Sequence, residues 1–267
     1  MKFMSAKIHL VEGLPAAGKS TFSYILQAKL RQEGRTTVYY KEETSQPVDL
    51  FRQSVLPQEE YAALADRYPS LREELEQNSF ASGPYHVVAY TKLRYDAQLR
   101  CTALEELRSY DIGDGRVPLS EYQRLHLYFL RQFVTRAQKT SQDYIVEGAF
   151  LHNQLLDIIG FYDLPEAALV AYYRELLEVL APLRPHIYYI YPSNIEALID
   201  SALTERGESE GTWGWGFASW IECAPYGQRK SLHGRSGMAA VYRQMHRASR
   251  FLIEGIGADA EWIERQV

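Results

Sequence analysis

The chain has 267 residues, which is enough for one large domain or two small ones. Its net charge of -5 argues against a general nucleic-acid-binding protein, because binding to a phosphate backbone requires a surplus of basic residues. The two cysteines, Cys101 and Cys223, form no C-x-x-C pair, which disfavours a metal or dithiol redox site. Because the sequence contains neither a signal-peptide core nor an apolar run long enough to cross a membrane, we expect a cytoplasmic protein.

A glycine-rich turn near the amino end is the most specific motif in the sequence. It lies within KIHLVEGLPAAGKST, residues 7–21, and four of its residues fit the Walker A pattern G-x-x-x-x-G-K-[ST]: Gly13, Gly18, Lys19 and Ser20. A short apolar run precedes the turn as a predicted strand, and apolar residues at helical spacing follow it. Glycine allows the backbone to approach an anion closely, and the N–H groups at the start of a helix bind phosphate.

This turn predicts a nucleotide-binding site. We expect Lys19 to reach the β- and γ-phosphates of ATP and the Ser20 hydroxyl to ligate Mg²⁺. The other loop residues are expected to contact the phosphates as well: Gly13, Ala16, Ala17, Gly18 and Thr21. ATP is favoured over GTP because the sequence has no guanine-reading N-K-x-D tetrapeptide. The competing interpretation is a glycine-rich turn that carries a surface lysine.

The second predicted strand covers Thr36 to Tyr40 and ends close to two acidic residues, Glu42 and Glu43. Ligands bind at the carboxyl ends of strands in open α/β sheets, so a carboxylate here is placed to accept the proton of an acceptor hydroxyl. Glu42 is the candidate base, and Glu43 is its neighbour in the expected substrate site. The alternative is a solvated turn that happens to contain two glutamates.

The segment from Asp49 to Gln138 is expected to be mostly helical. Within it, the apolar run Tyr85 to Tyr90 is compatible with a strand or with the start of a long helix, and we favour the helix. It is far longer than an ordinary connection between two strands, so it must do more than connect them. We expect it to wall off a pocket for a phosphoryl acceptor. Four residues are candidates for this pocket by their position alone: Asp49, Tyr90, Lys92 and Arg94.

The third predicted strand covers Asp143 to Val146 and ends at Glu147. An acid at the end of a short strand beside the phosphate-binding strand is the pattern that supports a metal ion or its water. Glu147 is therefore the candidate metal-binding carboxylate, together with Ser20. The alternative is an ordinary acid at the end of a strand.

The carboxyl-terminal part contains a fourth predicted strand, Pro185 to Tyr191, and a short final one, Glu261 to Glu264. Between them lies a glycine-rich, charged stretch, residues 204–216, which then becomes tryptophan-rich. Such a loop beside a nucleotide could close over the phosphates, with Arg206 offering charge to the transferring phosphoryl group. Arg235 belongs to a second basic cluster that could assist. The alternative is a surface loop whose tryptophans pack on the core.

The order of the elements predicts an α/β fold. Five strand candidates alternate with helices, which indicates a parallel sheet with helices on both faces and the glycine-rich loop on a central strand. We expect one domain over residues 1–267. Its core would comprise residues 1–47 and 140–267, with a helical acceptor-binding insert over 48–139 and a lid over about 204–235.

These motifs together resemble the P-loop kinase superfamily, in particular its nucleoside and nucleotide (thymidylate-like) kinase branch and a group of bacterial P-loop kinase-like proteins. The resemblance lies in GLPAAGKST at 13–21, YYKEETSQPVD at 39–49, YIVEG at 144–148 and TERG at 204–207. It implies a P-loop sheet of five strands, an acceptor region after strand two and a lid after strand four. It also implies catalytic roles for four residues: Lys19, Glu42, Glu147 and Arg206.

The expected activity is ATP- and Mg²⁺-dependent transfer of the γ-phosphoryl group to a hydroxyl or phosphate of a small molecule. One alternative is a phosphotransferase acting on a natural product or an antibiotic, because the aromatic residues of the insert suit a bulky ring. The other alternative is a nucleotide-binding regulatory ATPase that is not a kinase. No nucleic-acid or membrane partner is expected, and a homodimer is compatible with the sequence.

Overall fold

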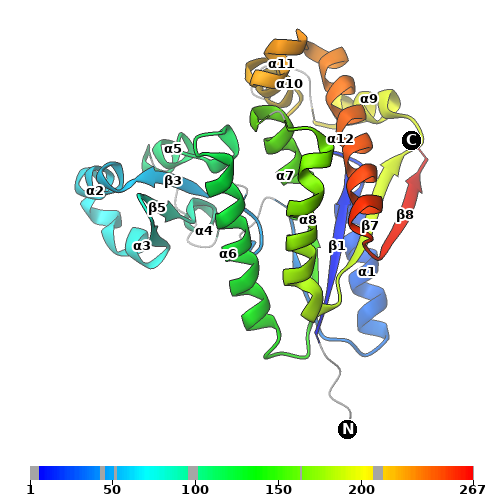
Figure 1. The fold of residues 1–267 in the computed structure, drawn as a ribbon, viewed down its shortest axis with the longest axis horizontal. Helices are drawn as coiled ribbons and strands as arrows, with labels where there is room; N and C mark the ends of the chain where they lie inside the picture. Colours follow the sequence, from blue (N-terminus) through cyan, green and yellow to red (C-terminus); the bar gives the residue numbers. More distant parts are fainter. Residues whose placement is uncertain are drawn as a thin grey trace.

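The computed structural model describes residues 6–42, 46–50, 53–95, 102–162, 164–206 and 213–266. Its core is a five-stranded parallel sheet with the strand order β2-β6-β1-β7-β8 (Figure 1). The strands are β1 (Lys7–Gly13), β2 (Thr37–Tyr40), β6 (Asp143–Glu147), β7 (His186–Pro192) and β8 (Ala260–Arg265). The predicted α/β class and the five-stranded parallel sheet are therefore confirmed.

The central strands bring distant parts of the chain to one edge of the sheet. β1 is buried except at Lys7, and β6 is buried throughout, as expected for strands covered on both faces. Val11 pairs with Glu147, and Gly13 pairs with Ile190. The carboxyl ends of β1, β6 and β7 therefore meet where the glycine-rich turn begins.

Helices cover both faces of this sheet. Neighbouring residues of a strand point to opposite faces, and on β7 Tyr188 contacts Phe22 whereas Tyr189 contacts His246. Phe22 belongs to α1 (Lys19–Gln32) and His246 to α12 (Gly234–Ile256), so these two helices lie on opposite faces. α8 (Glu166–Leu180) packs beside α12, and α6 (Leu119–Ala137) packs beside α8 (Figure 1).

The segment between β2 and β6 contains a second, antiparallel sheet in the order β3-β5-β4. Its strands are β3 (Ser54–Pro57), β4 (Ser79–Ser82) and β5 (Tyr85–Val88). They pack with α2 (Gln58–Arg67), α3 (Arg72–Gln77), α4 (Tyr90–Tyr95) and α5 (Thr102–Arg108) around a small apolar core of their own. Figure 1 shows this unit projecting to one side of the main sheet, beyond α6.

The helix predicted over Tyr85 to Tyr90 is wrong, because residues 85–88 form β5. Gly83 adopts a positive φ of 59°, which lets the chain turn back so that β4 pairs with β5. β5 then gains β3 as a second neighbour, and Val87 and Val88 become buried. Pairing with two neighbouring strands therefore decided the conformation of residues 85–88, and the segment predicted to be mostly helical also contains a three-stranded sheet.

The remaining helices follow β6 and β7. They are α7 (His152–Asp157), α9 (Ile195–Arg206), α10 (Trp213–Cys223) and α11 (Pro225–Lys230). Of the stretch predicted as a loop, residues 207–212 lie outside the described residues, and the tryptophan-rich part that follows begins helix α10. Within the described ranges no helix is both long and apolar enough to cross a membrane.

Candidate active site

The turn between β1 and α1 contains two glycines with positive φ, Gly13 and Gly18. Gly13 has a φ of 149°, and a Cβ atom there would lie 2.2 Å from the carbonyl oxygen of Ile190 on β7, so only glycine fits. Gly18 has a φ of 93° and immediately precedes α1; of the side chains that the structure describes, none caps this helix. The first N–H groups of α1 therefore face outward without an intrahelical acceptor.

A cavity of about 880 Å³ opens over this turn. One side is formed by the loop and the start of α1: Pro15, Ala16, Gly18, Lys19, Ser20 and Thr21. The ends of the neighbouring strands and α7 add Glu42, Glu147, His152 and Asn153. This volume is sufficient for the phosphate chain of a nucleotide together with part of a second small molecule.

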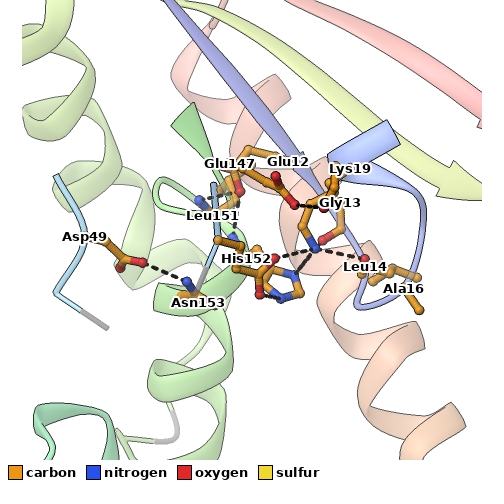
Figure 2. Close-up of polar contacts among 12 residues, drawn as sticks. Glu12, Gly13, Leu14, Ala16, Lys19, Asp49, Glu147, Leu151, His152 and Asn153 are labelled. Atoms are coloured by element: carbon orange, nitrogen blue, oxygen red, sulfur yellow. Dashed lines mark hydrogen bonds and ion pairs between the residues drawn. The ribbon is translucent and has the colours of Figure 1, made fainter. Parts of the chain in front are cut away.

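Lys19 is the first residue of α1 and is almost completely buried. Its Nζ donates to the carbonyl oxygen of Leu14 at 3.3 Å and lies 3.1 Å from Oε2 of Glu42. His152 Nδ1 lies 3.4 Å from the same Nζ (Figure 2). The ammonium group is thus held over the loop by an ion pair with Glu42.

Glu42 lies two residues after β2 and is bound through both carboxylate oxygens. Oε2 faces Lys19, and Oε1 lies 3.3 Å from Nε2 of His152. Burial alone would raise the pKa of Glu42, but the charges of Lys19 and His152 outweigh burial and hold this pKa well below its usual range. Glu42 is therefore a carboxylate at neutral pH, with the role of a hydrogen-bond acceptor.

Ser20, in the first turn of α1, and Glu147, at the end of β6, form a direct pair. The Ser20 hydroxyl donates to Oε1 of Glu147 at 2.6 Å, and the Tyr39 hydroxyl donates to Oε2. Burial raises the pKa of Tyr39, so this phenol stays a donor. The backbone carbonyl of Glu147 also accepts from Nε2 of Gln46 at 2.9 Å. These contacts fix the carboxylate beside the first turn of α1.

The oxygen donors of this pair suit Mg²⁺. Magnesium prefers oxygen ligands and is usually held by one or two protein groups while phosphate oxygens and water complete its coordination. No cluster of three or more histidine, cysteine or acidic residues that could hold a metal occurs among the described residues. The chemistry of the Ser20 hydroxyl and Glu147 carboxylate therefore fits a magnesium ion shared with a triphosphate, rather than one enclosed by protein.

Glu12 is a buried acid that sequence reasoning missed. Its carboxylate accepts hydrogen bonds from the N–H groups of Phe150 (2.9 Å), Leu151 (3.1 Å) and His152 (2.9 Å). Burial raises the pKa of Glu12, although these three bonds favour its ionised form. The contacts tie the start of α7 to the end of β1 and so place His152 beside the loop (Figure 2).

Arg265 is a second missed residue, at the end of β8. Its Nη1 donates to the carbonyl oxygen of Ala16 at 2.9 Å, and a Cβ atom at Gly18 would lie 3.2 Å from this nitrogen. A cation therefore lies against the loop and lines the cavity. The signal in the sequence was an arginine directly after the predicted final strand, but only the parallel pairing of β8 with β7 places it here.

The wall opposite the loop combines aromatic and acidic residues. Phe217 and Trp220 of α10 lie in parallel, with ring centroids 5.9 Å apart and an angle of 7° between the planes. Asp111 accepts a hydrogen bond from the Tyr90 hydroxyl, and Asp157 accepts one from Tyr122 at 2.9 Å. Tyr90, Asp111 and Asp157 all line the cavity. This wall offers ring surfaces and hydrogen-bonding oxygens to a ligand.

Half of the sixteen predicted site residues line the cavity. Five of them belong to the loop and the start of α1, and three come from elsewhere: Glu42, Tyr90 and Glu147. Gly13 and Ala17 lie in the loop without lining the cavity. Glu43 lies outside the described residues, as do the side chains of Arg94 and Arg206.

Three other predicted residues lie elsewhere. Asp49 is buried and accepts hydrogen bonds from the side-chain amides of Asn153 and Gln154, both at 2.9 Å, so it anchors α7. Lys92 is exposed and does not line the cavity. Arg235 forms an exposed bidentate pair with Asp200 of α9.

A comparison with models of known protein families found no match, and no curated protein is significantly similar in sequence. The interpretation of the cavity therefore depends on its geometry and on the chemistry of the groups that line it.

Proposed function

We propose that the protein is an ATP- and Mg²⁺-dependent phosphotransferase of the P-loop kinase type, which moves a γ-phosphoryl group to a small-molecule hydroxyl or phosphate. One observation carries the proposal. A lysine and a hydroxyl from the start of α1 and two carboxylates from the ends of β6 and β2 converge over the glycine-rich turn. Phosphoryl transfer is catalysed mainly by positioning and charge stabilisation, and these residue types supply both.

The loop is suited to hold the triphosphate. The N–H groups at the start of α1 would donate to phosphate oxygens, and Lys19 would neutralise the β- and γ-phosphates. Arg265 adds positive charge beside Ala16, where it can contact the phosphate chain. A triphosphate must compete with Glu42 for Lys19, because the two side chains form an ion pair at 3.1 Å.

Ser20 and Glu147 would hold Mg²⁺. The ion supplies charge neutralisation to the phosphate oxygens when it is bound. The contribution of this chain is to fix the two donors: Tyr39 and Gln46 hold Glu147, and the helix start holds Ser20. Arg206 stays a candidate for a lid arginine, within the lid proposed over residues 204–235.

Glu42 would orient the acceptor. Its carboxylate lines the cavity beside Lys19 and can accept a hydrogen bond from an acceptor hydroxyl. The acceptor oxygen forms a bond to the γ-phosphorus, the bond from this phosphorus to the β,γ-bridging oxygen breaks, and ADP leaves. The hydroxyl proton passes to Glu42 or to the transferred phosphate, and a weakly basic carboxylate is sufficient in a loose transition state.

The aromatic wall favours a second candidate within the same chemistry, a phosphotransferase for a bulky ring compound such as a natural product or an antibiotic. The rings of Phe217 and Trp220 are parallel to each other, and both residues line the cavity. Ring faces of this kind bind flat or hydrophobic surfaces of a ligand. A nucleoside base also fits this description, so the acceptor must be found by experiment.

The test is a screen of ATP consumption with Mg²⁺ against nucleosides, nucleotides and aminoglycosides. The proposal predicts that at least one acceptor raises ADP production above the rate with water. Activity on aminoglycosides alone would select the second candidate. Slow hydrolysis that no acceptor stimulates would indicate a regulatory ATPase instead, and the absence of any turnover would contradict a phosphotransferase.

A further inference from the structure

His152 joins the nucleotide-binding loop to the candidate base and has no role in the proposal so far. Its side chain is buried, and its ring lies between Gly13, Lys19 and Glu42. We propose that His152 is a positioning residue that keeps Glu42 aimed at the acceptor once Lys19 has turned to the triphosphate. This inference rests on the proposed phosphotransferase function and adds a residue to it.

The two ring nitrogens of His152 face different partners. Nδ1 lies 2.7 Å from the carbonyl oxygen of Gly13 and 3.4 Å from Nζ of Lys19. Nε2 lies 3.3 Å from Oε1 of Glu42. His152 therefore binds the loop with one nitrogen and Glu42 with the other.

The second carboxylate oxygen of Glu42 pairs with Lys19, which the proposed reaction needs at the phosphates. Oε2 lies 3.1 Å from Nζ of Lys19, which has to serve the phosphates when nucleotide is bound. If Lys19 were its sole partner, Glu42 would lose its anchor at the moment of catalysis. The contact of Oε1 with His152 is independent of Lys19 and survives this exchange.

The position of His152 does not depend on the nucleotide either. Its backbone N–H donates to Glu12 at 2.9 Å, and the neighbouring Asn153 side chain donates to Asp49 at 2.9 Å. Both acceptors are buried. The start of α7 is therefore fixed to the sheet, and it holds the Nε2 atom at a constant place beside the cavity.

Two substitutions separate the functions of the two ring nitrogens. In His152→Asn, the amide nitrogen can replace Nδ1 and keep the bond to Gly13, but it cannot reach Glu42. In His152→Gln, the longer amide can replace Nε2 and donate to Glu42. If His152 only supports the loop, His152→Asn should retain more activity than His152→Gln. If His152 positions Glu42, His152→Gln should retain more.

The experiment measures two quantities on the full chain: kcat for Mg²⁺-dependent ATP hydrolysis, with water as the acceptor, and the Kd of a non-hydrolysable ATP analogue by calorimetry. We expect His152→Asn to lower kcat at least tenfold and to change Kd less than threefold. His152→Gln should retain kcat within about threefold of the wild type. In a Glu42→Gln background, His152→Asn should produce no further loss, because its effect passes through Glu42.

The outcomes separate this inference from the proposed function. If the wild-type protein turns over no ATP, with water or with any acceptor of the screen, the phosphotransferase function and the role of His152 both fail. If wild-type protein is active but both variants retain full kcat, or if the loss in His152→Asn persists undiminished in Glu42→Gln, only the role of His152 is overturned. A weaker Kd with unchanged kcat would assign His152 to support of the loop. Circular dichroism would confirm that each variant is folded.

Discussion

Glu42→Gln is the substitution with the least obvious expected result. In the structure this carboxylate forms an ion pair with the lysine that a triphosphate needs, at 3.1 Å. Removal of the charge should therefore have two opposite effects. Turnover should fall because the hydroxyl that receives the phosphoryl group loses the carboxylate that accepts its hydrogen bond. The affinity for nucleotide should rise because Lys19 no longer has a competing partner.

The magnitude of the second effect follows from the burial of the pair. The side chain of Lys19 is 4% exposed and that of Glu42 is 21% exposed, so the pair is intermediate between a surface and a buried ion pair. We expect about 1 to 2 kcal/mol, which corresponds to roughly five- to thirtyfold tighter binding of an ATP analogue. The loss of turnover should be about a hundredfold, at the lower end of the range for a proton-accepting group.

The assay combines calorimetry with the analogue and steady-state turnover at saturating ATP. Glu43→Gln is the matched control, since it changes the neighbouring residue by the same charge. It should leave the affinity for the analogue unchanged. Binding that becomes more than threefold weaker in Glu42→Gln would refute the competition for Lys19. If Glu43→Gln alone lowers turnover, the base is Glu43.

Three further predictions concern the lysine, the arginine of the last strand and acid stability. Lys19→Met should abolish turnover and weaken analogue binding at least tenfold in calorimetry, because a charge-assisted phosphate contact is lost, while circular dichroism shows an unchanged fold. Arg265→Ala should weaken analogue binding about three- to tenfold, and unchanged affinity would remove Arg265 from the nucleotide site. Burial lowers the pKa of His9 to about 4 and that of His126 to about 3, from an ordinary value of 6.5. The unfolded chain therefore binds protons that the folded chain does not, and the free energy of unfolding should fall below pH 6.5, by about 3 kcal/mol for His9 once pH 4 is reached. Urea unfolding at pH 4 to 7 checks this, and a flat profile would contradict it.

Local patterns located the parts of the site that follow a strand directly. Lys19, Ser20 and the loop glycines come from one motif, and Glu42 and Glu147 stand at or just after the ends of apolar strands. Parallel pairing of these strands brings their ends together, so position along the chain was sufficient to group them.

The residues that sequence reasoning missed make contacts over long distances along the chain. Glu12 binds the N–H of His152, 140 residues away, and Arg265 binds Ala16, 249 residues away. No local pattern indicates such a partner, because the contact depends on how the sheet and α7 are stacked. A charged residue in an otherwise apolar strand, as at Glu12, was the available signal.

The opposite error affected residues chosen by position alone. Asp49 follows β2 closely, but its carboxylate is used by two amides of α7 and not by the cavity. Arg235 was chosen for its charge, and Asp200 binds it on the surface. Residue type and approximate position do not reveal whether a neighbouring side chain already satisfies a charge.

The central claim is that the turn at residues 13–21 binds a nucleoside triphosphate through its backbone N–H groups and Lys19. Titration of the purified protein with a non-hydrolysable ATP analogue and Mg²⁺ in a calorimeter tests it most directly. The account predicts saturable binding at one site, weakened at least tenfold in Lys19→Met. Absence of heat with every purine triphosphate, or equal affinity in the wild type and Lys19→Met, would contradict it.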